Sequence, residues 1–238
     1  MKASPRVSVI VPCYNAARYL AEALTSALEQ QPSPDEVIVI DDGSADGSAG
    51  IAEHFGSPVR CVRQEQAGAA TARNHGVSLA RGELIAFLDA DDLWPDGSLA
   101  TRLALLEGDR TLDMASGLVK QFISPELPDE IRRTLVCPEA TSRGRVAGSM
   151  LIRRHAFDKV GEFNPTFRIG EAVDWVARAD AAGLVNAVAG EVVLLRRVHT
   201  TNTTTRLRDA KSDYLRVLKA SIDRRRAAGS GESTTGSE

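Results

Sequence analysis

A short apolar run that ends in three carboxylates constrains the fold of this sequence more than any other feature. Gly82 opens the run, the residues from Leu84 to Leu88 are all apolar, and Asp89, Asp91 and Asp92 follow directly. An apolar run of this length is typical of a buried strand. Open α/β sheets bind their ligands at the carboxyl ends of such strands. The run therefore predicts a buried central strand with an acidic ligand site at its end.

The spacing of these carboxylates indicates what the site binds. Asp89 and Asp91 are two positions apart, so in an extended segment their side chains point the same way. Neighbouring carboxylates repel each other unless a cation or a shared proton relieves the repulsion. Mg²⁺ or Mn²⁺, held by one or two carboxylates and by substrate phosphates, provides that relief. An isolated Asp-x-Asp is more often a solvated acidic turn, so the metal interpretation depends on the rest of the chain.

Three further apolar runs come before this strand and alternate with helical patterns. The runs predict strands at 7–11, 36–40 and 59–62, and the patterns between them predict helices over 16–30, up to 54, and over 69–80. This alternation with short connections predicts an α/β fold with a mainly parallel, doubly wound sheet sandwiched by helices. Later elements are expected as helices at 98–107, 155–160 and 171–182, and as strands within 112–122, at 147–152 and at 192–195.

Composition narrows the class of protein. The chain has 238 residues and 43% hydrophobic content, enough for one sizeable domain, and its net charge of −3 gives no support for nucleic-acid binding. Its three cysteines are widely spaced, which favours a reduced cytoplasmic protein. No apolar run reaches the ~18 residues of a transmembrane helix, and 7–11 is too short for a signal peptide. We expect at most peripheral membrane contact, through a basic amphipathic helix at 206–226.

Five stretches in order, taken together, resemble family 2 glycosyltransferases. They are 7–15, 39–44, 68–76, 87–92 and the late stretch that runs from 148 to His199. The resemblance covers about residues 6–200 and implies the GT-A fold, a Rossmann-like sheet with a nucleotide-sugar half and an acceptor half. We expect one GT-A domain over 1–226, with these halves at 6–97 and 98–200, a C-terminal helix at 206–226 and a disordered tail at 227–238.

The resemblance implies that residues after the first two strands bind the nucleotide of the donor. The ring of Tyr14 would stack on the base, and the backbone around Pro12 would bond the edge of the base. One carboxylate after the second strand would accept a hydrogen bond from the base or the ribose. Asp42 is favoured, because it is similar to the base-reading carboxylate of the family, whereas a turn contact explains Asp41 equally well.

The same resemblance assigns the diphosphate and the metal. Asp91 would bind the metal that bridges the phosphates, and Asp89 would hold the ribose or the metal through water, with Ala90 between them in the donor site. Arg73 would pair with a carboxylate or the diphosphate, and a structural salt bridge fits it nearly as well. His199 resembles a late family histidine that meets the diphosphate or the metal. The metal would stabilise, as a Lewis acid, the charge that builds on the leaving diphosphate.

An inverting transfer also needs a base that removes the proton of the acceptor. In the family this base is an Asp in a Glu-Asp pair just before a helix, but the matching position here is Ala172. Glu171 and Asp174 are three apart and share a helix face, so either can supply the carboxylate, while the other caps the helix. The sequence ranks these two residues nearly level.

The expected function is transfer of a hexose from a nucleoside-diphosphate sugar, most simply a UDP-sugar, to a hydroxyl acceptor. The acceptor is a saccharide, lipid-linked sugar, natural product or peptide, and its choice is expected to depend on 124–145 and on the C-terminal helix. Ala172 keeps open a nucleotide-sugar-binding protein with impaired catalysis. A nucleotidyltransferase also has an acidic metal site, but usually carries a Gly-rich loop where this chain has Pro12-Cys13-Tyr14-Asn15.

Overall fold

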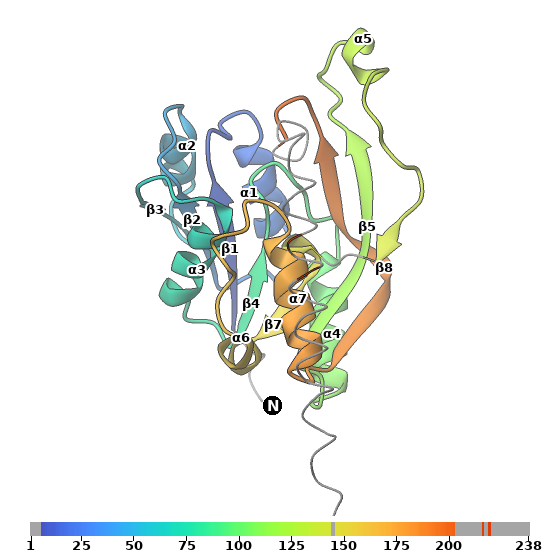
Figure 1. Cartoon of the computed structure of the whole chain (residues 1–238). Coiled ribbons are helices and arrows are strands. Elements are labelled where there is room, and N and C mark those ends of the chain that lie inside the picture. Colours follow the sequence, from blue (N-terminus) through green and yellow to red (C-terminus); the bar gives the residue numbers. More distant parts are fainter. Residues whose placement is uncertain (1–5, 144–145, 203–215, 217–218, 220–238) are drawn as a thin grey trace, which may run out of the picture.

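The computed structural model describes residues 6–143, 146–202, 216 and 219, and eight of its strands form one sheet (Figure 1). The strands are β1 (Val7–Cys13), β2 (Glu36–Asp41), β3 (Val59–Arg63), β4 (Leu84–Phe87), β5 (Met114–Ile123), β6 (Ser142–Arg143), β7 (Leu151–Arg153) and β8 (Asn186–Val198). The helices are α1 (Leu20–Leu28), α2 (Ser48–Phe55), α3 (Ala69–Leu79), α4 (Ser98–Gly108), α5 (Asp129–Arg132), α6 (Arg154–Val160) and α7 (Glu171–Ala181), with a 3₁₀ turn at Ala147–Ser149.

The sheet runs in the order β3-β2-β1-β4-β7-β5-β6, and β8 pairs with β5 outside this order. The pairs among β1 to β4 are parallel, and so is the pair of β5 with β8. Only β7 and β6 pair antiparallel with their neighbours. Because β7 is antiparallel to both β4 and β5, β5 runs parallel to β4. The strand β8 is parallel to β5, so it ends at the same edge of the sheet as β4. The predicted mainly parallel α/β fold is therefore confirmed.

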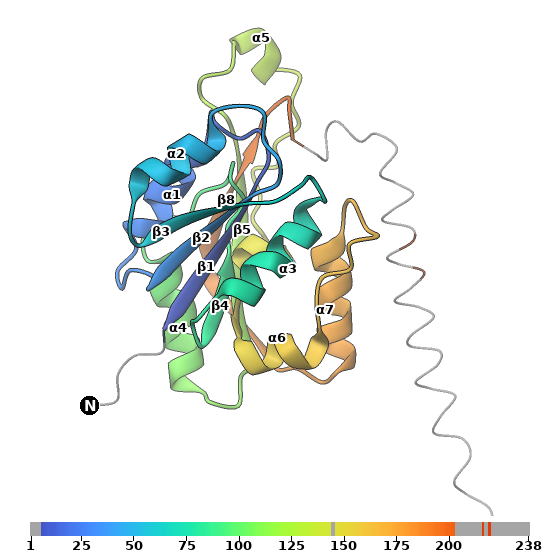
Figure 2. The same ribbon diagram turned by 90° about the vertical axis from the view of Figure 1, so that its left-hand side faces the viewer.

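Two helical layers cover the sheet, as Figure 2 shows, with α1, α2 and α4 on one face and α3, α6 and α7 on the other. The alternation of side chains along β1 explains this arrangement, since Val9 and Val11 pack in the first layer and Ile10 in the second. All three are fully buried. A strand buried on both faces is expected to be apolar at nearly every position, as β1 is.

Gly76 lets α3 pack closely against β1. A Cβ at this position would overlap the buried Ile10 side chain. We expect Gly76→Ala to lower the free energy of unfolding by about 1–3 kcal/mol, because an overpacked core must shift its neighbours. The control is Gly50→Ala in α2, where a Cβ meets nothing within 4 Å and should be neutral or stabilising. Urea unfolding of both variants measures this, and an unchanged stability of the Gly76 variant would contradict the close packing.

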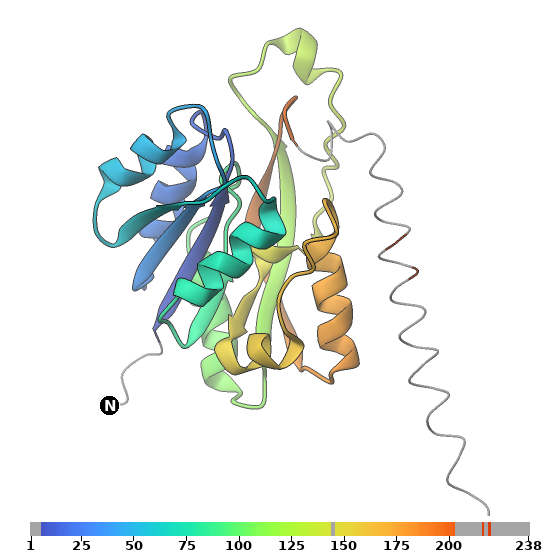
Figure 3. The ribbon, with the colours of Figure 1, turned by 60° about the vertical axis from the view of Figure 1, so that its left-hand side comes forward.

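Several elements differ from the sequence expectation. The first helix begins at Leu20 rather than at 16, and the last strand is Asn186–Val198 rather than 192–195. The expected loop at 124–145 contains α5 and β6, and α5 stands away from the sheet beyond the end of β5 (Figure 3). The predicted helix at 206–226 and tail at 227–238 lie outside the described residues, apart from 216 and 219, which are helical. No helix in the described ranges has the length and hydropathy needed to cross a membrane.

Candidate active site

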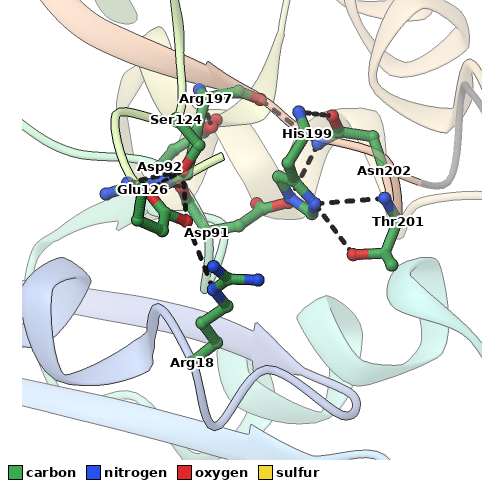
Figure 4. A network of polar contacts seen from close by, with 9 residues as sticks. All are labelled: Arg18, Asp91, Asp92, Ser124, Glu126, Arg197, His199, Thr201 and Asn202. Atoms are coloured by element: carbon green, nitrogen blue, oxygen red, sulfur yellow. Dashed lines mark hydrogen bonds and ion pairs between the residues drawn. The ribbon is translucent and has the colours of Figure 1, made fainter. Parts of the chain in front are cut away.

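The turn after β4 places the Asp-x-Asp motif at the carboxyl edge of the sheet, beside the end of β8. Asp91 Oδ2 lies 2.9 Å from His199 Nε2 and accepts a hydrogen bond from Asn202 Nδ2 at 3.2 Å (Figure 4). The other ring nitrogen of His199 accepts a hydrogen bond from the backbone N–H of Thr201 at 3.3 Å. His199 is buried, whereas the Asp91 side chain is 29% exposed. Two of the three predicted metal ligands, Asp91 and His199, thus lie together, although 108 positions separate them.

Arg73 of α3 joins the two halves of the sequence. Its Nη2 donates to Asp89 Oδ1 at 2.6 Å, and its Nη1 donates to Glu171 Oε1 at 2.5 Å. Burial lowers the pKa of Arg73, but the carboxylates of Asp89 and Glu171 outweigh burial and raise the pKa above its ordinary value. The guanidinium therefore stays charged. Asp89, Arg73 and Glu171 form one cluster, in which the Asp89 side chain remains 40% exposed.

Asp92 is the buried carboxylate of the motif. Its Oδ1 accepts a hydrogen bond from the backbone N–H of Arg197 at 2.9 Å. Burial, followed by the charges of Asp91 and Asp89, raises the pKa of Asp92 well above its ordinary value. Repulsion from Asp91 and Asp89 is thus the smaller part of this shift after burial, and a cation at Asp91 would weaken that repulsion.

Asp41 and Asp42 point to opposite faces of the sheet, as neighbours at a strand end do. Asp42 accepts hydrogen bonds of 2.7–2.8 Å from the loop between β3 and α3, namely from Gln64 Nε2 and the backbone N–H groups of Ala67 and Gly68. Asp41 is fully buried on the face of α1 and α2, where Arg63 Nε lies 3.0 Å from its Oδ2. Asp42 is also buried but holds the loop before α3, whereas Asp41 lies on the face of α1 and α2, and a role of Asp42 in donor binding stays a prediction.

Tyr14 follows β1 and is one of the few exposed large apolar side chains among the described residues, at 46% exposure. The loop behind it is held by Asn15, whose backbone N–H donates to Ser44 Oγ at 2.9 Å. Asn15 adopts a left-handed conformation, with φ of 49°. Pro12 is half-buried in β1, and Ala90 is buried beneath the motif turn. The Tyr14 ring is thus accessible for stacking at the ligand edge of the sheet.

The structure separates Glu171 from Asp174. Glu171 is the first residue of α7 and lies in the cluster with Arg73. Asp174 is buried, and its Oδ2 accepts a hydrogen bond from Arg178 Nε at 2.9 Å. Arg178 also donates to two backbone carbonyls near the end of α6, so Asp174 belongs to the contact between α7 and α6. Ala172 packs in the apolar layer on that face of the sheet.

Sequence reasoning missed Asn202, which bonds both Asp91 and the carbonyl of Arg197. The only sequence signal for this role is its position three residues after His199, where a tight turn brings the amide back. Trp175 is fully buried, stacks on Phe157 and donates to the Gly161 carbonyl, so it belongs to the core.

The donor set at the motif suits a hard divalent cation. Carboxylate oxygens are the ligands that Mg²⁺ and Mn²⁺ prefer, and Mg²⁺ commonly takes one or two of them and completes its shell with substrate phosphates and water. An imidazole suits Mn²⁺ better than Mg²⁺. Asp91 and His199 have this composition, and Asp89 lies beyond them in the same turn. In the described parts of the chain, no three His, Cys, Asp or Glu side chains are grouped as a preformed metal site. A cation here would therefore depend on substrate oxygens.

Comparison with known proteins agrees with this architecture. The chain is 35% identical over 149 residues to an uncharacterized glycosyltransferase, EpsJ, of Bacillus subtilis, which covers 58% of this chain and 42% of EpsJ. It is 34% identical over 197 residues to the succinoglycan biosynthesis protein ExoU of Rhizobium meliloti, which covers 74% of this chain and 57% of ExoU. The chain thus spans about half the length of these two relatives.

Solved structures with the same fold include those of S. aureus TarS residues 1–349. The complex of TarS with UDP matches with a TM-score of 0.69 and 20% identity, over 92% of this chain and 65% of TarS. The complex with UDP-GlcNAc matches with a TM-score of 0.72 over 92% and 66%. The family model of glycosyl transferase family 2 matches residues 8–161, which is more than half of the sequence. The chain therefore belongs to glycosyl transferase family 2.

Proposed function

We propose that this chain transfers a sugar from a UDP-sugar to a hydroxyl acceptor, with inversion and with Mg²⁺ or Mn²⁺, in glycan or glycoconjugate biosynthesis. The observation that carries the proposal is the meeting of Asp91 and His199 with the Asp89, Arg73 and Glu171 cluster at one edge of the sheet. Family membership supports the class of reaction. The UDP and UDP-GlcNAc bound to TarS favour uridine, and the name of ExoU favours a saccharide acceptor.

The nucleotide half, 6–97, would bind the donor. Tyr14 would stack on the uracil with its exposed ring, and Asp42 would read the base or ribose while it holds the loop between β3 and α3. Arg73 would neutralise Asp89 and orient it toward the ribose. Asp91 and His199 would hold the cation, which when bound supplies Lewis-acid stabilisation of the diphosphate charge. The acceptor half, 98–200, would contribute Glu171.

Glu171 is the base that we propose, in place of the missing Asp at Ala172. Arg73 engages only Oε1 of Glu171, and Oε2 forms no hydrogen bond with any described residue. Oε2 would take the proton of the acceptor hydroxyl as that oxygen attacks the anomeric carbon. The bond between the anomeric carbon and the phosphate oxygen breaks on the opposite face, and its electron pair leaves with UDP. The proton on Glu171 is then lost to solvent.

Tyr14→Ala should weaken the binding of UDP, because a stacked base contributes roughly 1–3 kcal/mol, or about 5- to 150-fold in Kd. Tyr14→Phe keeps the ring and should bind UDP nearly as well as the wild type. Titration calorimetry with UDP, in the presence and absence of Mn²⁺, measures both. Equal affinity of the alanine variant and the wild type would place the base elsewhere.

A second candidate is a nucleotide-sugar-binding protein without turnover, and Ala172 is the observation that favours it. Both candidates require Mn²⁺-dependent UDP binding, so binding alone does not separate them. Incubation with UDP-sugars and simple saccharide acceptors separates the two candidates, because only the transferase releases free UDP and forms a new glycoside. The match of residues 8–161 to the glycosyl transferase family 2 model favours both of these candidates over a nucleotidyltransferase.

A further inference from the structure

We propose that Arg197 is a positioning residue that holds the Asp91 turn in the shape needed for the cation and diphosphate. This inference rests on the function proposed for Asp91. Arg197 Nε donates to the backbone carbonyl of Asp91 at 2.9 Å, and its own backbone N–H donates to Asp92 Oδ1 at 2.9 Å (Figure 4). One residue of β8 thus contacts both the backbone of Asp91 and the side chain of its buried neighbour.

The guanidinium of Arg197 is itself held on every side. It lies between the rings of Tyr19 and Phe122, at 4.7 and 4.9 Å from their centroids. Nη1 donates to Ser124 Oγ at 3.1 Å, and Nη2 pairs with Glu22 at 2.5 Å. Only 2% of Arg197 is exposed. Direct neutralisation of a diphosphate by this side chain does not fit, because each of its three nitrogens already has an acceptor and the group is covered.

The last residues of β8 and the residue that follows it contact the motif turn at several positions. Leu195 and Leu93 form an antiparallel bridge with backbone hydrogen bonds of 3.0 and 2.8 Å. Arg197 and His199 are two positions further on in turn, so both side chains face the turn. The Tyr19 ring braces them together, since it also packs on the His199 ring at 4.6 Å between centroids. Removing Arg197 would therefore loosen Asp91 and leave every side chain that would bind the cation in the chain.

We call the contacts of Arg197 with Asp91, Asp92, Ser124 and Glu22 the Arg197 clamp. This clamp is connected to two loops that flank the site. Ser124, at the start of the 124–143 excursion, donates to Glu126 at 2.7 Å, and Glu126 pairs with Arg18 at 3.2 Å. Arg18 belongs to the loop between β1 and α1, which also carries Tyr14. Arg197 thus connects the motif turn with two other segments. One is the loop that carries Tyr14, which would stack on the nucleotide base, and the other is the start of the 124–143 segment.

The test is Arg197→Lys, measured by the Mn²⁺ concentration that gives half-maximal UDP binding. Lysine keeps the charge but has one nitrogen, so it cannot serve the Asp91 carbonyl, Ser124 and Glu22 together. We expect the Mn²⁺ requirement to rise about 10- to 100-fold, as when other residues that orient metal ligands are changed. Binding of uridine, which has no phosphates, should weaken far less than the Mn²⁺-dependent binding of UDP.

The matched control is Arg102→Lys. Arg102 is also fully buried over an aromatic ring, at 4.3 Å from the Trp94 centroid, but among the described residues it donates only to Ser98 and Met150. It should lose stability without a change in the Mn²⁺ requirement. If the Arg197 variant does not fold, Ser124→Ala removes one contact of the clamp and should raise the requirement about threefold or more.

Three results would overturn the inference. The first is a wild-type Mn²⁺ requirement in Arg197→Lys, or in Ser124→Ala if the lysine variant does not fold. This result would exclude a positioning role for Arg197 and would leave the proposed function unaffected. An equal rise in the Arg102 control attributes the effect to general loss of stability. Absence of Mn²⁺-dependent UDP binding in the wild type removes the proposed function, and the inference with it.

Discussion

Asp91→Asn is expected to lower Mn²⁺-dependent turnover of the donor about 100- to 1,000-fold. Asparagine keeps the size of the side chain and the contacts with His199 and Asn202, but it loses the negative charge that would hold the cation. Groups that stabilise charge in a transition state typically contribute this much to kcat. Release of UDP from the UDP-sugar, followed with and without Mn²⁺, measures the loss.

Asp96→Asn is the control for this change. Asp96 is exposed and lies five positions further along the same turn region, so it tests whether any carboxylate near the motif matters. It should retain wild-type turnover and the wild-type Mn²⁺ requirement. Near-normal turnover in the Asp91 variant would contradict the assignment of the cation to this residue.

Glu171→Gln is expected to lower kcat about 100- to 10,000-fold, with little change in the binding of UDP. Glutamine is nearly the same size and can still accept a hydrogen bond from Arg73, but it cannot take the proton of the acceptor. A separation of kcat from UDP affinity distinguishes a lost base from a disrupted site. Transfer to a saccharide acceptor at saturating UDP-sugar gives kcat, and calorimetry gives the affinity.

Asp174→Asn provides the comparison, because Asp174 is the other carboxylate on the same helix. Its ion pair with Arg178 is buried between α7 and α6, so loss of the pair should lower the free energy of unfolding by about 1.5–3 kcal/mol. The kcat of this variant should stay within a fewfold of the wild-type value. Loss of kcat in the Asp174 variant alone would transfer the role of base to Asp174 and contradict our assignment of Glu171.

The parts of the fold that could be predicted are those with a strong local pattern. β1, β2 and β4 are buried on both faces, so their apolar runs are continuous and their ends are marked by polar residues. β8 was predicted too short, because the half from 186 to 191 is mostly exposed and polar or small. It is a strand because it pairs with β5, about 70 residues away, and no local pattern records that pairing.

The candidate site likewise contains residues that local sequence patterns predict and residues that only the folded structure brings together. The position of Asp91 after β4 and the face of Asp42 follow from strand ends and side-chain alternation. The link between Arg73 and Glu171 joins residues 98 positions apart, so only the packing of α3 against α7 decides that Glu171, rather than Asp174, enters the cluster. Arg197 was equally hidden, since a sequence shows an arginine but not that its guanidinium is covered by two rings.

A turnover screen of the purified chain is the direct test of metal-dependent, inverting sugar transfer from a UDP-sugar. The protein is incubated with UDP-, GDP- and dTDP-sugars, with and without Mn²⁺, and in the presence of simple saccharide acceptors, while free nucleoside diphosphate and new glycoside are measured. Our account predicts Mn²⁺-dependent release of UDP from one UDP-sugar, with a glycoside of inverted anomeric configuration. Absence of Mn²⁺-dependent turnover with every donor, or a product of retained configuration, would contradict it.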